Sequence, residues 1–121
     1  MEDQGKANEL VEQANERYNG GDKLGAAPLY LEAVRAFPAY GSFGLVAGDT
    51  YREAGQHDEA VEAYQTCIAV APDHDQAWHG LGQSYLALGR NDEAREAFGH
   101  AGVPFPLDAR PGCLARLFGG G

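Results

Sequence analysis

One short pattern recurs along this chain at a spacing of 34 residues. The run from Gly55 to Tyr64 reappears from Gly89 to Phe98, with the glycine, the Asp-Glu pair, both alanines and the aromatic residue at matching positions. Gly21 stands one further step upstream. A fixed period of this length predicts a stack of similar supersecondary units, in which each unit buries its apolar face against its neighbours.

Three prolines fall into the same register and mark the ends of the units. Pro38, Pro72 and Pro106 each follow an apolar stretch that a proline terminates if the stretch is helical. The chain therefore divides into three copies of one unit. They are residues 7–40, 41–74 and 75–108.

Within each unit the apolar residues follow a helical period twice. In the third unit, Trp78, Leu81, Gly82 and Tyr85 share one face at positions i, i+3, i+4 and i+7. After a break at residues 89–91, a second face is formed by Ala94, Phe98 and Ala101. Each unit is therefore predicted to be a helix, a tight turn and a second helix, and the fold class to be all-α.

Small and aromatic residues alternate between the two helices of a unit. A glycine or alanine in the first helix lets the second helix approach closely, and an aromatic residue in the second helix fills the space beside it. This complementarity is expected to fix each helix pair. The matched positions are Ala14 with Tyr30, Gly48 with Tyr64, and Gly82 with Phe98.

These positions resemble the signature of the tetratricopeptide repeat family. The third unit carries every signature residue, namely Trp78, Leu81, Gly82, Tyr85, Ala94, Phe98, Ala101 and Pro106. The second unit departs from the pattern at Gly44, which replaces the tryptophan, and at Cys67, which replaces an alanine. The resemblance implies an α-solenoid, a right-handed superhelix of antiparallel helix pairs that forms a single domain over residues 1–121.

The segment after the third unit is predicted to form one short helix at about residues 111–118. Its apolar stripe would consist of Leu114, Leu117 and Phe118. The last helix of a solenoid exposes an apolar face unless another segment covers it, so we expect a capping helix here. A helix that is exposed for a partner is the alternative.

Composition limits the classes of partner. A length of 121 residues fits one domain, and a net charge of -9 disfavours nucleic acids and anionic membrane surfaces, which require clustered lysine and arginine. The two cysteines form no CxxC pair, the N-terminal residues are acidic and polar, and no stretch reaches the length of a membrane span. We expect a soluble cytoplasmic protein.

The residues that resemble chemical motifs have simpler structural explanations. Asp73, His74, Asp75 and His79 contain metal-ligand types, but the aspartates follow Pro72 where a helix N-cap is expected. The chain has no nucleophile elbow, and no glycine-rich phosphate loop. We predict no metal, no cofactor and no enzymatic activity.

The family resemblance implies a concave groove that is lined by the first helix of each unit and holds a peptide or helix of a partner protein. In this register the groove residues are Asn8, Val11, Glu12, Asn15, Ser42, Leu45, Val46, Asp49, Arg52, Gln76, His79 and Gln83. The predicted function is therefore that of a protein interaction module, as a scaffold, an adaptor or a chaperone-like protein.

One branch of the family binds the C-terminal carboxylates of heat-shock chaperones through basic and asparagine residues. Of the positions that match this clamp, only Asn15 agrees, because the others are Val11, Val46, Gln76 and Gly80. Without cationic donors a carboxylate is not bound by charge-assisted hydrogen bonds. We therefore expect a basic or neutral amphipathic segment as the partner. The alternative function is self-association into a structural homo-oligomer.

Overall fold

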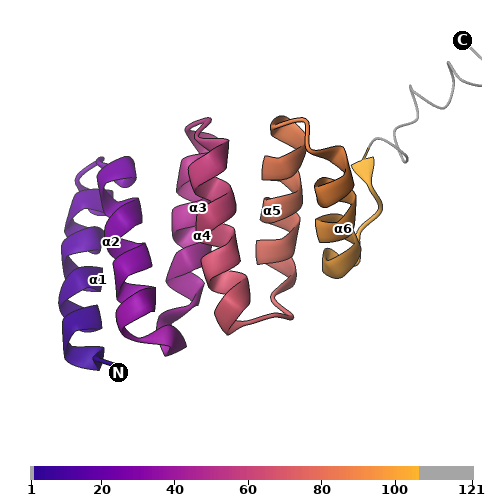
Figure 1. Ribbon diagram of the computed structural model, residues 1–121. Helices are drawn as coiled ribbons and strands as arrows, with labels where there is room; N and C mark the ends of the chain where they lie inside the picture. Colours follow the sequence, from indigo (N-terminus) through magenta and orange to yellow (C-terminus); the bar gives the residue numbers. More distant parts are fainter. Residues whose placement is uncertain (1, 107–121) are drawn as a thin grey trace, which may run out of the picture.

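The computed structural model describes residues 2–106, and every element of regular structure there is helical. The predicted all-α fold is confirmed. The helices lie side by side in sequence order, with α1 at one end of the stack and α6 at the other (Figure 1). The elements are α1 (Gln4–Asn19), α2 (Lys23–Ala36), the 3₁₀ helix η1 (Pro38–Tyr40), α3 (Ser42–Glu53), α4 (His57–Val70), α5 (Asp75–Ala87) and α6 (Asn91–Ala101).

Three glycines close the tight turns between the paired helices. Gly21, Gly55 and Gly89 have φ angles of 95°, 81° and 77°, in the left-handed region that residues with a side chain rarely adopt. These three glycines are the ones that recur every 34 residues in the sequence. The repeat therefore keeps a glycine wherever the turn needs a positive φ. Each turn reverses the chain and makes α1–α2, α3–α4 and α5–α6 antiparallel pairs (Figure 1).

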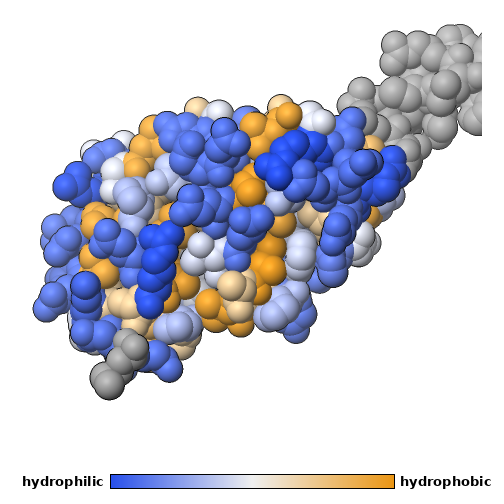
Figure 2. All heavy atoms as spheres, in the orientation of Figure 1, coloured by the Kyte–Doolittle hydropathy of each residue, from blue (hydrophilic) through white to orange (hydrophobic). Residues whose placement is uncertain are grey.

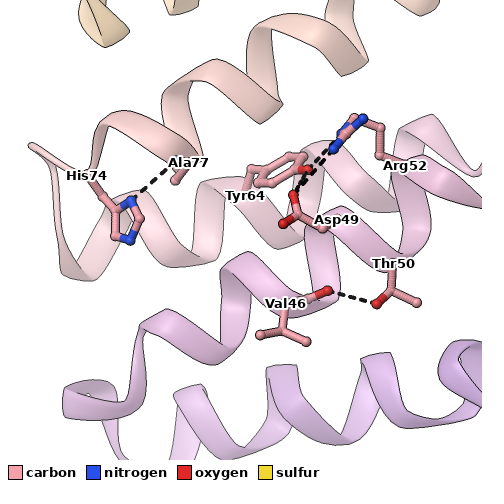
Figure 3. Close-up of polar contacts among 7 residues, drawn as sticks. All are labelled: Val46, Asp49, Thr50, Arg52, Tyr64, His74 and Ala77. Carbon is pink, nitrogen blue, oxygen red and sulfur yellow. Dashed lines mark hydrogen bonds and ion pairs between the residues drawn. The ribbon is translucent and has the colours of Figure 1, made fainter. Parts of the chain in front are cut away.

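The N-terminus of α5 differs from the sequence-based expectation. Its cap is His74, whose Nδ1 accepts a hydrogen bond from the backbone N–H of Ala77 at 3.3 Å (Figure 3). Asp75 is the first helical residue, where its charge still favours the helix dipole. Asp73 lies before the cap, so neither aspartate caps the helix.

Aromatic side chains from the second helices are wedged against glycines of the first helices. Tyr64 is fully buried, and a Cβ atom at Gly48 would lie 2.6 Å from its ring carbon Cδ1. The ring also lies against Gly80 of α5. Phe98 is buried against Gly82, where a Cβ atom would lie 3.0 Å from its Cδ1. Tyr64 therefore joins the second helix pair to the third as well as closing its own.

The face of the stack seen in Figure 2 is mostly hydrophilic, with hydrophobic residues exposed in patches between the hydrophilic ones. Within residues 2–106, no helix combines the length and the hydrophobicity that a membrane span requires. The predicted capping helix at about residues 111–118 and Cys113 lie outside the described residues. The other cysteine, Cys67, is buried.

Candidate functional site

Two hollows lie along the side of the stack that the first helices of the pairs form. We call these two hollows together the groove. The N-terminal hollow has a volume of about 560 Å³ and lies between α1, η1 and the start of α3. Its lining is rich in amides and carboxylates. The residues are Asn8, Val11, Glu12, Asn15, Glu16, Asn19, Tyr40 and Phe43.

Two tyrosines hold the asparagines of the N-terminal hollow in place. The Tyr40 hydroxyl donates to Oδ1 of Asn8, and the Tyr30 hydroxyl donates to Oδ1 of Asn15, each at 2.5 Å. Burial raises the pKa of Tyr30, so its hydroxyl keeps the proton that it donates. Each of these bonds uses the carbonyl oxygen, so the amide N–H groups of Asn8 and Asn15, which line the hollow, remain available as hydrogen-bond donors.

The central hollow lies between α3 and α5 and has a volume of about 220 Å³. Its lining is more polar than that of the N-terminal hollow, and it combines one cation with one carboxylate, one imidazole and two amides. The residues are Leu45, Asp49, Arg52, Gln76, His79, Gly80 and Gln83.

A buried tyrosine organises the charged pair of the central hollow (Figure 3). The Tyr64 hydroxyl donates to Oδ1 of Asp49 at 2.5 Å and accepts from Nε of Arg52 at 3.0 Å. The guanidinium also lies 3.6 Å from the Asp49 carboxylate. Burial, and then the hydrogen bond to Asp49, raises the pKa of Tyr64, while the hydrogen bond to Tyr64 is the main cause that raises the pKa of Arg52.

The groove carries a negative charge. Arg52 is the one lysine or arginine among the residues that line the two hollows, and Asp49 balances it. Glu12 and Glu16 line the N-terminal hollow and make no ion pair with any residue in the range 2–106. The electrostatic field along the groove is therefore negative.

Ten of the twelve groove residues predicted from the sequence line one hollow or the other. Asn8, Val11, Glu12 and Asn15 line the N-terminal hollow, and Leu45, Asp49, Arg52, Gln76, His79 and Gln83 line the central one. Ser42 and Val46 line neither. Ser42 is exposed at the start of α3, and Val46 packs beside the core cluster around Tyr30. That these residues bind a peptide stays a prediction.

The sequence-based reasoning missed Tyr40 and Phe43 in the wall of the N-terminal hollow. They pack edge to face with ring centroids 5.8 Å apart, and Phe43 stacks on Tyr30 at 5.2 Å. Tyr40 belongs to η1, which the helical period of the repeat does not predict. The signal that was available is the aromatic clustering of residues 37, 40 and 43 around the junction of two units.

In the part of the chain that the structure describes, no cluster of three or more histidine, cysteine or acidic side chains is arranged to hold a metal ion. His74 is occupied as a helix cap, and His79 packs edge-on against Phe98 with centroids 5.6 Å apart. The polar groups of the groove are spread over several helix turns, which suits contacts along an extended ligand.

Comparisons with known proteins agree with this architecture. Residues 45–103 match the family model described as tetratricopeptide repeat. The chain is 27% identical over 97 residues to the small glutamine-rich tetratricopeptide repeat-containing protein 2 of Mycosarcoma maydis, an alignment that covers 80% of this chain and 28% of that protein. It is 29% identical over 84 residues to protein bimA of Emericella nidulans, which covers 69% of this chain and 10% of that protein.

Solved structures share the fold. The second tetratricopeptide domain of Spaghetti (RPAP3), bound to the HSP90 peptide SRMEEVD, matches with a TM-score of 0.67 and 18% identity, over 81% of this chain and 91% of that one. MamA matches with a TM-score of 0.67 and 26% identity, over 82% of this chain and 58% of that one. The family model thus identifies residues 45–103 as tetratricopeptide repeats, and the helix pairs with their glycine and aromatic contacts show the same repeat fold in the part of the chain that the structure describes.

The chain spans only 28% and 10% of the lengths of these two curated relatives. The functions of those whole proteins therefore do not transfer to this chain.

Proposed function

We propose that the groove binds a segment of a partner protein, extended or helical, and that the chain acts as a scaffold, an adaptor or a chaperone-like module in the cytoplasm. The proposal assigns no catalytic role to the chain. The observation that carries it is the line of amide, carboxylate and imidazole side chains along the two hollows, of which Asn15 and Asp49 are held by buried tyrosines. Preformed polar groups of this kind reduce the ordering cost of binding.

The proposed partner segment is basic or neutral and amphipathic. Glu12 and Glu16 attract lysine or arginine, and the asparagine amides donate to backbone carbonyls of an extended chain. Val11 and Phe43 offer apolar contacts between these polar groups. The combination suits alternating basic and apolar side chains.

Acidic C-terminal peptides, such as the HSP90 peptide bound by the similar Spaghetti domains, fit this groove poorly. Four of the five positions that would clamp a terminal carboxylate lack the required donor, and Gly80 has no room for one. Any side chain at Gly80 would collide with the ring of Tyr64, which is buried between α3 and α5. The peptide SRMEEVD is therefore expected to bind no more tightly than a scrambled version of itself.

Selection from a random peptide library tests the chemistry of the partner. The proposal predicts enrichment of peptides that combine lysine or arginine with apolar residues. The double variant Glu12→Lys and Glu16→Lys should lose this enrichment, while Gln13→Lys, an exposed position of α1 that does not line the hollow, should keep it. Equal enrichment by all three proteins would contradict the proposal.

Alanine substitutions test the location of the site. Asn15→Ala and His79→Ala remove one donor from each hollow, and each should weaken binding of a selected peptide by about five- to tenfold. Gln13→Ala is the control on the surface of α1. Because Asn15 also accepts from Tyr30, thermal unfolding of the variant shows whether any loss comes from the fold.

Self-assembly into a homo-oligomer is the alternative function. Light scattering over a concentration series separates the two, because the groove proposal predicts a monomer at every concentration. A mass that rises with concentration and falls after addition of a selected peptide would show that copies of the chain occupy the groove themselves.

A further inference from the structure

A third hollow lies on the opposite side of α5, between α4 and α6, and the groove does not include it. This α4/α6 hollow has a volume of about 290 Å³. Ile68, Trp78, Leu81 and Tyr85 provide most of its apolar lining. Glu93 and Glu96 of α6 stand at its edge.

At the equivalent place one repeat earlier, an ion pair links the two second helices. Subtracting the repeat spacing maps Ala69 onto Arg35 and Glu96 onto Glu62. Arg35 of α2 reaches across to Glu62 of α4, with Nη2 and Oε1 3.1 Å apart. Val34, the residue that precedes Arg35, is only 2% exposed.

At the α4/α6 hollow no cation stands at the position equivalent to Arg35, and the nearby Arg90 lies over the ring of Tyr85, 4.7 Å from its centroid. Residue 69 is an exposed alanine, and Ile68, which corresponds to Val34, is only half-buried. Glu93 is occupied, because both its oxygens accept from Arg90, at 2.7 and 2.6 Å. Glu96 makes no hydrogen bond or ion pair with any other residue of the described range.

The tryptophan also has no counterpart in the earlier unit, where Gly44 stands at its position. Trp78 is fixed from two directions. Its Nε1 donates to the Pro72 carbonyl at 2.6 Å, and its ring stacks on His100 with centroids 4.0 Å apart. A fixed aromatic wall beside a carboxylate that has no partner within residues 2–106 suits a ligand that has an apolar part and a cationic part.

We propose that the α4/α6 hollow is a second binding site, which takes a helical segment of a partner protein carrying an arginine or lysine one turn away from a bulky apolar residue. The apolar side chain fills the hollow against Trp78 and Leu81, and the cation pairs with Glu96. The partner thus supplies the contact that Arg35 makes within the chain at the preceding junction. The net charge of -9 favours approach of such a segment.

Trp78 offers a direct readout, because it is the one tryptophan of the chain. The probe is a synthetic amphipathic helix with leucines on one face and arginines along the edge of that face. The control probe is a scrambled peptide of the same composition and charge, which has no apolar face when helical. The first peptide should shift the Trp78 emission and saturate, and the scrambled peptide should bind at least about tenfold more weakly.

Two variants and one control distinguish binding at this hollow from non-specific electrostatic attraction of the peptide to the acidic protein. Ala69→Arg reproduces the arrangement at Arg35 and should fill the hollow, weakening the probe by about tenfold or more. Glu96→Gln removes the carboxylate and nearly preserves shape, and it should weaken the probe by about threefold to tenfold. Glu32→Gln, an exposed position of α2, changes the net charge equally and should leave binding unchanged. All three should unfold at the temperature of the parent protein.

Several outcomes would overturn the proposal. One is equal binding of the two peptides, and another is unchanged affinity for the probe in both Ala69→Arg and Glu96→Gln. A third is a Trp78 emission that depends on protein concentration in the absence of peptide, because this would indicate that a second copy of the chain occupies the hollow. If Ala69→Arg does not fold, Glu96→Gln alone decides. The site is independent of the groove, so loss of groove binding in Asn15→Ala should leave these titrations unaltered.

Discussion

The hydroxyl of Tyr64 donates to the Asp49 carboxylate across 2.5 Å, and it connects the packing of the core to the surface of the groove. Tyr30 and Asn15 repeat this relationship one unit earlier. In the third unit the corresponding residues are Phe98 and Gln83. Since Phe98 has no hydroxyl, it cannot make the same bond to the Gln83 amide.

Removing the Tyr64 hydroxyl should destabilise the fold and loosen the groove together. Tyr64→Phe leaves the ring between Gly48 and Gly80 but removes the bonds to Asp49 and Arg52. We expect a loss of about 1–2 kcal/mol in the free energy of unfolding, measured with urea. Tyr30→Phe is the matched control and should lose less, about 0.5 kcal/mol, because its partner is an uncharged amide.

Glycine at position 80 is required by the Tyr64 ring. Gly80→Ala should destabilise by about 1–3 kcal/mol, because the added methyl group would overlap a ring that is buried from both sides. Gly99→Ala in α6 is the control, since no described residue outside its own stretch of helix lies within 4 Å of the added Cβ, and it should stabilise by about 0.5–1 kcal/mol through helix propensity. Thermal unfolding of both variants checks the pair. Equal effects of the two substitutions would show that the ring is not confined.

Stability should fall at alkaline pH. The pKa of Tyr64 is raised in the folded state, so the folded protein holds its proton where the unfolded chain releases it. The contribution of this pKa shift to the free energy of unfolding is fully present below about pH 10. It declines as the pH rises further, by up to about 1.4 kcal/mol per pH unit. Tyr30 and Tyr51 are shifted in the same direction. Urea unfolding at several alkaline pH values measures the slope, and Tyr64→Phe should reduce it. An unchanged slope in that variant would assign the effect to the other tyrosines.

Ser84 occupies a core position at a cost. Its side chain is fully buried in α5, and its hydroxyl has no hydrogen-bond partner in the described part of the chain. Ser84→Ala should therefore raise the free energy of unfolding by about 0.5–1 kcal/mol. Thr50, one repeat earlier, is only half-buried and donates to the Val46 carbonyl at 2.8 Å (Figure 3), so Thr50→Ala should not stabilise. A loss of stability in Ser84→Ala would contradict this account of the hydroxyl.

The repeat made most of the helical architecture predictable. A fixed spacing specifies which residues of every unit share a face, so the contacts of Gly48 with Tyr64 and of Gly82 with Phe98 follow from the sequence. The same register placed Asp49, Arg52 and His79 on the side of the first helices.

Features outside the period were not predictable in this way. Tyr40 lines the groove from η1, a turn of 3₁₀ helix between two units, and Val46 turns toward the core where the groove was expected. His74 caps α5 because its ring nitrogen reaches the Ala77 amide, a geometry that residue type alone does not fix. The α4/α6 hollow depends on a difference between units, Ala69 against Arg35, and a search for matching positions passes over such differences.

Chemical-shift mapping on the isotopically labelled chain tests the groove most directly. The probe is a basic amphipathic peptide obtained by the library selection. The account predicts that its largest shift changes fall on the amides of Asn8, Asn15, Asp49 and His79, and that they saturate together at one peptide per chain. Saturable changes that leave these four amides unaffected and fall on other faces of the stack would contradict it.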